Sequence, residues 1–188
     1  MMSERNERKI HFEKEGSILK MTILEPMDIM EYYQITMAED TLGVADQVTN
    51  NVLWDNAMQM MKKGKYYAFS IGEMKYNIRK DEESVTIDVQ KPKGDRIQEK
   101  RIEYQEGNVN YTYFSCEHDQ EGSTFLTKYY NYPVQEEGDW YFTMEEAQKE
   151  MYSFLEDLEI SEEVSQLIDY PNLKENVLAS FEEKSTIK

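Results

Sequence analysis

The sequence predicts an α+β fold built on an antiparallel sheet, and three observations support this prediction. The hydrophobic period changes from about 3.6 residues to about 2 near Gly64, and the longer period returns after Asp139. Between these points, runs rich in Tyr, Val, Ile, Thr and Phe are separated by short turn segments. Such short connections join antiparallel neighbours, because a crossover between parallel strands needs a dozen or more residues.

The N-terminal part is predicted to begin with a polar lead over residues 1–8, followed by a short hairpin. Apolar and polar residues alternate from Ile10 to Glu13, and an apolar run resumes over residues 18–24. The segment Glu15-Gly16-Ser17 between them is typical of a turn. Residues 10–24 are therefore expected to form two paired strands.

Two helices are expected between this hairpin and the sheet. Pro26 fits the first position of a helix that runs to about Met37. A second helix is expected from about Asp46 to Met61, followed by Gly64. Since glycine adopts the left-handed conformation at low cost, Gly64 is expected to close that helix.

An antiparallel meander of about six strands is expected after Gly64. Its strands are expected at residues 65–71, 74–79, 85–89, 96–104, 109–116 and 124–130. Tyr111, Tyr113 and Tyr129 occupy alternate positions, which suits a sheet with one packed face and one wet face.

Two or three acidic helices are expected after the loop 131–139. Thr143 and Glu146 match the capping box, and an apolar stripe follows to about Leu158. Ser161 suits the cap of a short helix that Pro171 ends, and Asn172 suits the cap of a last one. The absence of a long linker favours one domain over residues 1–188.

The order of these elements resembles the general plan of the helix-grip fold, in which a curved antiparallel sheet wraps a C-terminal helix. The comparison is based on element order alone. The resemblance implies an apolar cavity between sheet and helix as one alternative for function.

Charge is distributed unevenly along the chain. The formal net charge of the 188 residues is -17, of which residues 1–100 contribute -3 and residues 101–188 contribute -14. A field of one sign repels nucleic acid and anionic membranes and attracts basic surfaces. The expected partner is therefore a basic protein surface, with no direct binding to nucleic acid or membrane.

The cysteine content and the first residues of the chain indicate the cellular compartment of the protein. The chain has one cysteine, so no internal disulfide is expected, and Met1 to Ile10 lack the apolar core of a signal peptide. No apolar run approaches the roughly 18 residues that span a bilayer. These features favour a cytoplasmic protein, and the excess of lysine over arginine favours a bacterial or phage source with an AT-rich genome.

The segment Cys116-Glu117-His118-Asp119 contains groups that can bind a metal or form a nucleophile–base pair. In an extended strand, Cys116 and His118 point to one face and the two acids to the other. Zinc would need further ligands, and the only other histidine is His11. Cys116 is therefore expected to end a buried strand and His118 to open a turn.

Other catalytic and binding patterns receive no support. No acid pair can be singled out among 38 acids, and no glycine-rich phosphate loop or zinc-protease motif is present. Asp95 and Glu99 dilute a local group of basic residues, which is expected to lie on a solvated hairpin: Lys91, Lys93, Arg96, Lys100 and Arg101. No catalytic residue, metal ligand set or cofactor is assigned.

The candidate binding residues are eight acids that follow the loop: Glu145, Glu146, Glu150, Glu156, Asp157, Glu159, Glu162 and Glu163. In a continuous helix they would lie about 3.5 Å apart on average, similar to the phosphates of a single DNA strand. Glu146 and Glu150 are like charges four residues apart, and within the helix only Glu145 and Lys149 form a compensating pair.

Three functions are compatible with these observations. The leading hypothesis is a non-enzymatic interaction protein whose acidic helices occupy a basic, nucleic-acid-binding surface of a partner, as nuclease inhibitors and toxin immunity proteins do. The first alternative is a domain that binds a small apolar ligand. The second is a small enzyme that uses Cys116 and His118.

Overall fold

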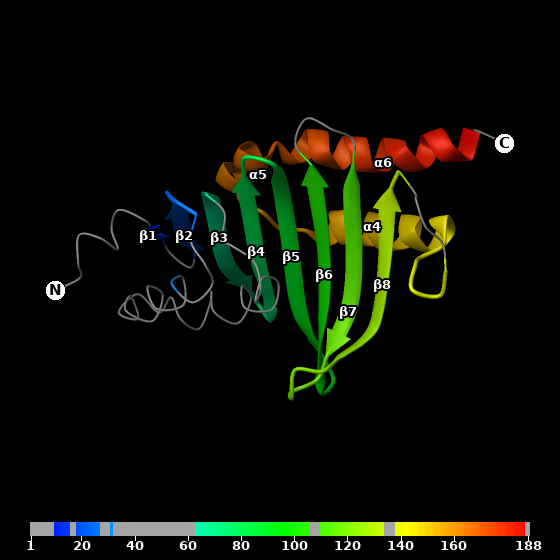
Figure 1. Cartoon of the computed structure of the whole chain (residues 1–188), viewed down its shortest axis with the longest axis horizontal. Coiled ribbons are helices and arrows are strands. Elements are labelled where there is room, and N and C mark those ends of the chain that lie inside the picture. Colours follow the sequence, from blue (N-terminus) through cyan, green and yellow to red (C-terminus); the bar gives the residue numbers. More distant parts are fainter. Residues whose placement is uncertain are drawn as a thin grey trace. The chain divides into compact units, whose positions relative to one another are not determined.

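The computed structural model describes residues 10–15, 18–26, 31, 63–105, 110–133 and 138–186. These residues form an α+β fold in which eight antiparallel strands follow one another in chain order, with three helices after them (Figure 1). Contacts divide the chain into two compact units, Met1–Glu82 and Glu83–Lys188. The α+β class and the antiparallel sheet are confirmed, and the single domain stays a prediction.

The first unit contains strands β1 (Ile10–Glu15), β2 (Ile18–Ile23), β3 (Gly64–Ile71) and β4 (Met74–Asp81). Each strand pairs antiparallel with the next, so the predicted hairpin joins the sheet through β2 and β3. This pairing explains why the sheet has eight strands where a meander of about six was expected. The polar lead and nearly all of the two helices predicted before Gly64 lie outside the described residues.

Gly64 has a different role from the predicted one. It is the first residue of β3, where it pairs with Asp81, and its φ angle does not lie in the left-handed region. A Cβ atom at this position would collide with the carbonyl oxygen of Lys80. The prediction of a left-handed helix end is therefore wrong, because the close approach of β4 is what requires glycine here.

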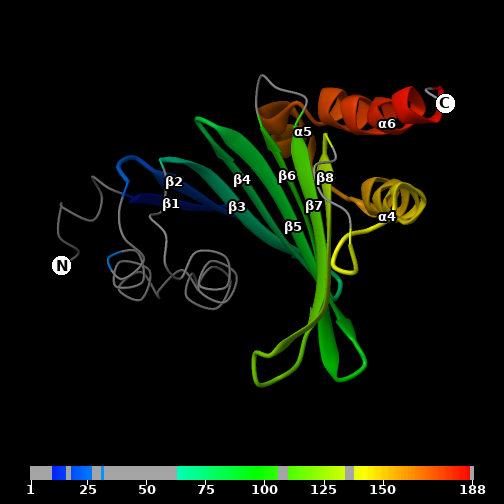
Figure 2. The same cartoon turned by 45° about the vertical axis from the view of Figure 1, so that its right-hand side comes forward.

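The second unit contains four strands and three helices, which are β5 (Ser84–Lys93), β6 (Arg96–Gln105), β7 (Tyr111–His118), β8 (Thr124–Tyr132), α4 (Met144–Asp157), α5 (Glu162–Ile168) and α6 (Tyr170–Thr186). Each of these strands pairs antiparallel with the next. Helices α4 and α6 lie on the same face of these strands (Figure 2).

Aromatic side chains join this sheet to its helices. Tyr113 lies opposite Ile102 and Tyr130 in the strand register, and all three are buried. The Tyr113 ring contacts Phe154 of α4 edge-on, and the Tyr130 ring stacks on Phe181 of α6, each at a centroid distance of 5.6 Å. Because side chains alternate along a strand, the neighbours of these residues point to the opposite face.

A bulge in β8 changes which residues share a face. Glu117 lies opposite Phe125, whereas Ser115 lies opposite Lys128, so β8 has one extra residue around Leu126, whose φ is 53°. As a result Tyr130, and not Tyr129, shares the helix-facing side with Tyr113. Tyr129 therefore lies on the face opposite to that of Tyr113, since a bulge shifts the alternation by one.

The helix starts largely follow the predictions. Thr143 and Glu146 form the predicted capping box of α4, and Ser161 caps α5. However, the left-handed residue Asp169 ends α5, and Pro171 lies in the first turn of α6 together with Asn172. Proline fits there because the first turn of a helix does not need its backbone N–H group.

Candidate functional site

The eight candidate acids lie along α4, the link after it and α5. Seven of them are exposed, and Glu150 is half-buried. Lys149 is the only basic residue between Glu145 and Glu163, and its side chain is also exposed. The structure therefore keeps most of this charge at the surface of the second unit.

Glu146 and Glu150 each contact a lysine of the sheet. One carboxylate oxygen of Glu146 accepts a hydrogen bond from the Thr143 backbone N–H at 3.1 Å, and the other lies 3.1 Å from Lys128 Nζ. Together these contacts lower the pKa of Glu146, and the backbone hydrogen bond from Thr143 makes the largest contribution. Glu150 lies 3.3 Å from Lys100 Nζ and accepts a hydrogen bond from the Tyr113 hydroxyl at 3.1 Å.

These contacts correct the expectation that repulsion between Glu146 and Glu150 is uncompensated. Spacing within the helix could not reveal compensation, because both lysines come from strands that are distant in the sequence. Both acids are therefore part of the contact between α4 and the sheet. Glu145 and Glu156 lie on the opposite side of α4 from the buried stripe of Ala147, Met151, Phe154 and Leu155.

On the hairpin of the five basic residues, Lys91 and Lys93 are exposed, and Arg96, Lys100 and Arg101 are half-buried. Lys93 and Arg96 both pair with Glu117, at 2.9 and 3.6 Å. Lys100 pairs with Glu150, and Arg101 pairs with Asp88 at 3.0 Å. Internal ion pairs thus occupy four of the five basic residues.

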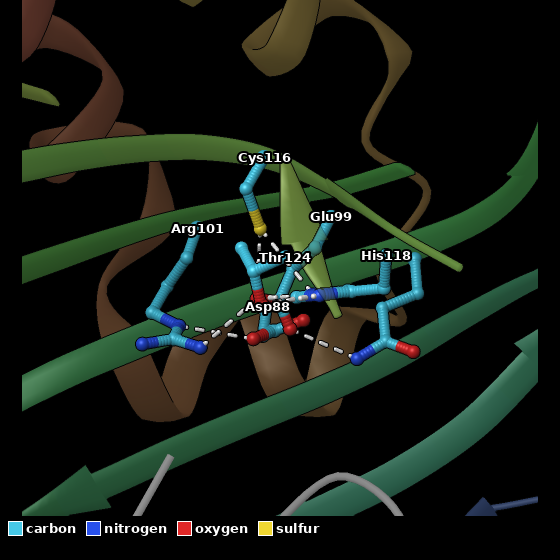
Figure 3. A network of polar contacts seen from close by, with 7 residues as sticks. Asp88, Glu99, Arg101, Cys116, His118 and Thr124 are labelled. Carbon is cyan, nitrogen blue, oxygen red and sulfur yellow. Dashed lines mark hydrogen bonds and ion pairs between the residues drawn. The ribbon is translucent and has the colours of Figure 1, made fainter. Parts of the chain in front are cut away.

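A second candidate site is a buried polar cluster on the face of the sheet opposite to α4 and α6. The strand register places Glu99 of β6 directly opposite Cys116 of β7. Glu99 Oε1 lies 3.8 Å from Cys116 Sγ and 3.4 Å from His118 Nε2, while Sγ and Nε2 are 3.3 Å apart. Figure 3 shows these three side chains converging from the two strands.

Further side chains fix the orientation of these groups. His118 Nδ1 lies 3.2 Å from Thr124 Oγ1, so Nε2 is the ring nitrogen that faces Glu99 and Cys116. Gln90 donates a hydrogen bond to the second oxygen of Glu99 at 2.9 Å. Arg101 lies between Glu99, at 3.3 Å, and Asp88.

The cluster is almost fully enclosed: Glu99 and Cys116 are each 1 % exposed and His118 is 5 % exposed. Burial, followed by the nearby negative charge of Glu99, raises the pKa of the Cys116 thiol well above its usual range. A nucleophilic cysteine needs the opposite shift, because the thiolate is the reactive form. The isolated thiol is thus poorly suited to nucleophilic attack.

The prediction that Cys116 is buried in a strand is confirmed, but the strand ends at His118 and not at Cys116, so the prediction that His118 opens the turn is wrong. The sequence did not identify Glu99 as a member of the site. An acid at a buried position of an expected strand, such as Glu99 or Asp88, was the only pattern in the sequence that could have pointed to this site. Only the pairing of β6 with β7 shows which acid meets the thiol.

No protein-family model, curated protein or solved structure matches this chain. Among the described residues, no helix combines the length and the apolar character that crossing a bilayer requires.

Proposed function

We propose that this chain is a non-enzymatic interaction protein of the inhibitor or immunity type, which docks the acidic residues of α4 and α5 on a basic surface of a partner protein. The observation that supports this proposal is the exposure of seven of the eight acids, with Lys149 as the one base among them. The complementary surface would be one that otherwise binds nucleic acid, since exposed carboxylates attract the same basic side chains as phosphates do.

The acids differ in the role that they can have in docking. Glu145 and Glu156 point away from the body of the second unit and are exposed. Glu146 and Glu150 are held by Lys128 and Lys100, so a partner would have to compete with those lysines. We therefore assign direct contact to Glu145 and Glu156, and the positioning of α4 to the other two.

The small-ligand alternative has less support from the packing. Tyr113 and Met151 are fully buried, and the Tyr113 ring contacts both Phe142 and Phe154. A cavity for an apolar ligand would need part of the space that these side chains fill. The enzyme alternative is opposed by the raised pKa of Cys116.

The proposal can be tested by capturing partners from a lysate of the source cells with the tagged chain at about 0.1 and about 0.5 M salt. Screening shortens the range of exposed charges from about 10 Å at the lower concentration, so a partner held by charge is lost at the higher one. A captured basic protein is then purified and its Kd is measured with the variants described next.

Two double variants remove the same charge from the same helix. We expect Glu145→Gln/Glu156→Gln to weaken binding about 3- to 30-fold, as is usual when two exposed charge pairs are lost. Glu146→Gln/Glu150→Gln, the matched control, should change binding less and lower the stability of the chain instead. Equal binding by the wild type and the Glu145→Gln/Glu156→Gln variant at the lower salt concentration would falsify the assignment.

A further inference from the structure

The Glu99–Cys116–His118 cluster has the dimensions of a metal site. Each residue offers one ligand atom, and these atoms all lie within 4.8 Å of one another. Typical bonds from zinc are about 2.3 Å to sulfur, about 2.0–2.1 Å to nitrogen and about 2.0–2.2 Å to oxygen. With tetrahedral angles, these bonds place S and N about 3.6 Å apart, S and O about 3.6 Å apart, and N and O about 3.4 Å apart.

The observed triangle agrees with one face of such a tetrahedron. The S–N, S–O and N–O distances are 3.3, 3.8 and 3.4 Å. An ion at the centre would therefore need shifts of only about 0.3 Å in these atoms, a displacement that ordinary side-chain relaxation supplies.

The surroundings have the features that orient metal ligands. Histidine ligands commonly use their second nitrogen for a hydrogen bond that fixes the ring, and His118 has such a contact with Thr124. The second oxygen of Glu99 is likewise held by Gln90. Arg101 Nη2 lies 3.3 Å from Glu99 Oε1, the oxygen that faces Cys116 and His118, and Arg101 Nε is paired with Asp88 at 3.0 Å. A metal ion at the centre would therefore share this oxygen with Arg101.

We propose that Glu99, Cys116 and His118 form a three-ligand site for a divalent transition metal of the zinc class, with a fourth position for water or an added ligand. The mixed oxygen, sulfur and nitrogen donors exclude magnesium and calcium, which prefer oxygen donors alone. On binding, the metal replaces the proton on Cys116 Sγ, and this proton passes to the solvent. Coordination thereby stabilises the thiolate, which burial alone opposes.

The site is tested by titrating the full chain with Co²⁺, a spectroscopic substitute for zinc, and by measuring zinc affinity in competition with a chromophoric chelator. The wild type should give the near-ultraviolet thiolate-to-cobalt band and the strong visible bands of four-coordinate cobalt. Cys116→Ser should abolish the thiolate band. Glu99→Gln and His118→Gln should each weaken zinc binding at least about 100-fold, more than the 10- to 100-fold loss typical of outer-shell changes.

Two control variants make the same substitutions, Glu to Gln and His to Gln, at positions outside the cluster. Glu117→Gln removes the same charge one residue from Cys116, but Glu117 lies on the other face with Lys93. His11→Gln removes the only other histidine, which is exposed on β1. Both controls should bind cobalt and zinc as the wild type does.

Folding of each variant is checked by circular dichroism, and thermal melts with and without zinc provide a second measurement. Zinc should raise the Tm of the wild type and of both controls, and leave that of Cys116→Ser unchanged. The proposal is overturned if the wild type shows no thiolate-to-cobalt band. It is also overturned if folded Cys116→Ser or Glu99→Gln retains wild-type affinity.

Discussion

Glu99 and Cys116 face each other across two neighbouring strands, with Glu99 Oε1 3.8 Å from Cys116 Sγ. A carboxylate beside a buried thiolate is unfavourable unless a cation lies between them, because two negative charges repel strongly in a low dielectric. The pair is therefore compatible with a protonated thiol that donates to the carboxylate, and the metal site proposed above would be a second arrangement. His118 contributes to either one.

The contact between His118 and Thr124 gives a prediction about metal affinity. Thr124→Val keeps the shape of the side chain but removes the hydroxyl that orients the ring. We expect about 10-fold weaker zinc binding, with the thiolate-to-cobalt band retained, since all three ligands remain. The control is Thr112→Val in β7, a threonine that pairs with Glu103 outside the cluster. Equal affinities of the two variants would contradict an orienting role for Thr124.

The hydrogen bond between Tyr111 and Ser180 is expected to anchor α6 to β7. The two hydroxyl oxygens are 2.7 Å apart and both residues are buried. Ser180→Ala leaves the Tyr111 hydroxyl without this partner, so the free energy of unfolding should fall by about 1–3 kcal/mol. The double variant Tyr111→Phe/Ser180→Ala should lose less than the sum of the two single variants in urea denaturation. Additive losses would show that the two hydroxyls are not coupled.

Leu126 gives a prediction of increased stability. Its φ of 53° is unfavourable for leucine, and its side chain is 69 % exposed, so little burial is lost on substitution. Asparagine tolerates the left-handed conformation, and Leu126→Asn should raise the free energy of unfolding by about 0.5–1 kcal/mol. Leu126→Val, which adds a branch at Cβ, should lower it. The opposite order in chemical denaturation would mean that the bulge does not lie at Leu126.

Glu117 gives a prediction about pH. The hydrogen bond from Lys93 and the charge of Arg96 lower the pKa of Glu117 in the folded chain. A lowered folded pKa contributes stability above the ordinary carboxyl pKa of about 4.3, and that contribution is lost as the pH falls through the folded value. Glu117→Gln should therefore cost about 1 kcal/mol at about pH 7, a modest value because Lys93 is largely exposed, and less at about pH 3. Urea denaturation at both pH values measures this difference, and a cost independent of pH would contradict it.

The strands and helix starts could be predicted from the sequence because their signals are local. The capping box of Thr143 and Glu146 and the alternation in β5 to β8 involve residues close together in the chain. The role of Gly64 and the face on which Tyr129 lies could not be predicted, since Gly64 depends on an event in a neighbouring strand and Tyr129 on an event within its own strand, β8. For Gly64 that event is the approach of Lys80, and for Tyr129 it is the bulge at Leu126.

The candidate sites could likewise be predicted only where their residues are close together in the sequence. That Cys116 and His118 share one face follows from their spacing, and the acids of the C-terminal segment are visible in the sequence. Glu99 could not be identified, because an acid 17 residues from Cys116 meets the thiol only through strand register. In the same way, Lys128 and Lys100 meet Glu146 and Glu150 only after α4 has packed on the sheet.

The most direct measurement of the Glu99–Cys116–His118 site is the zinc K-edge X-ray absorption spectrum of the full chain loaded with one equivalent of zinc. We expect one sulfur at about 2.3 Å and nitrogen or oxygen neighbours at about 2.0–2.1 Å, including the outer-shell scattering of one imidazole. Cys116→Ser should lose the sulfur contribution. A wild-type spectrum with nitrogen and oxygen neighbours alone would contradict binding at this cluster.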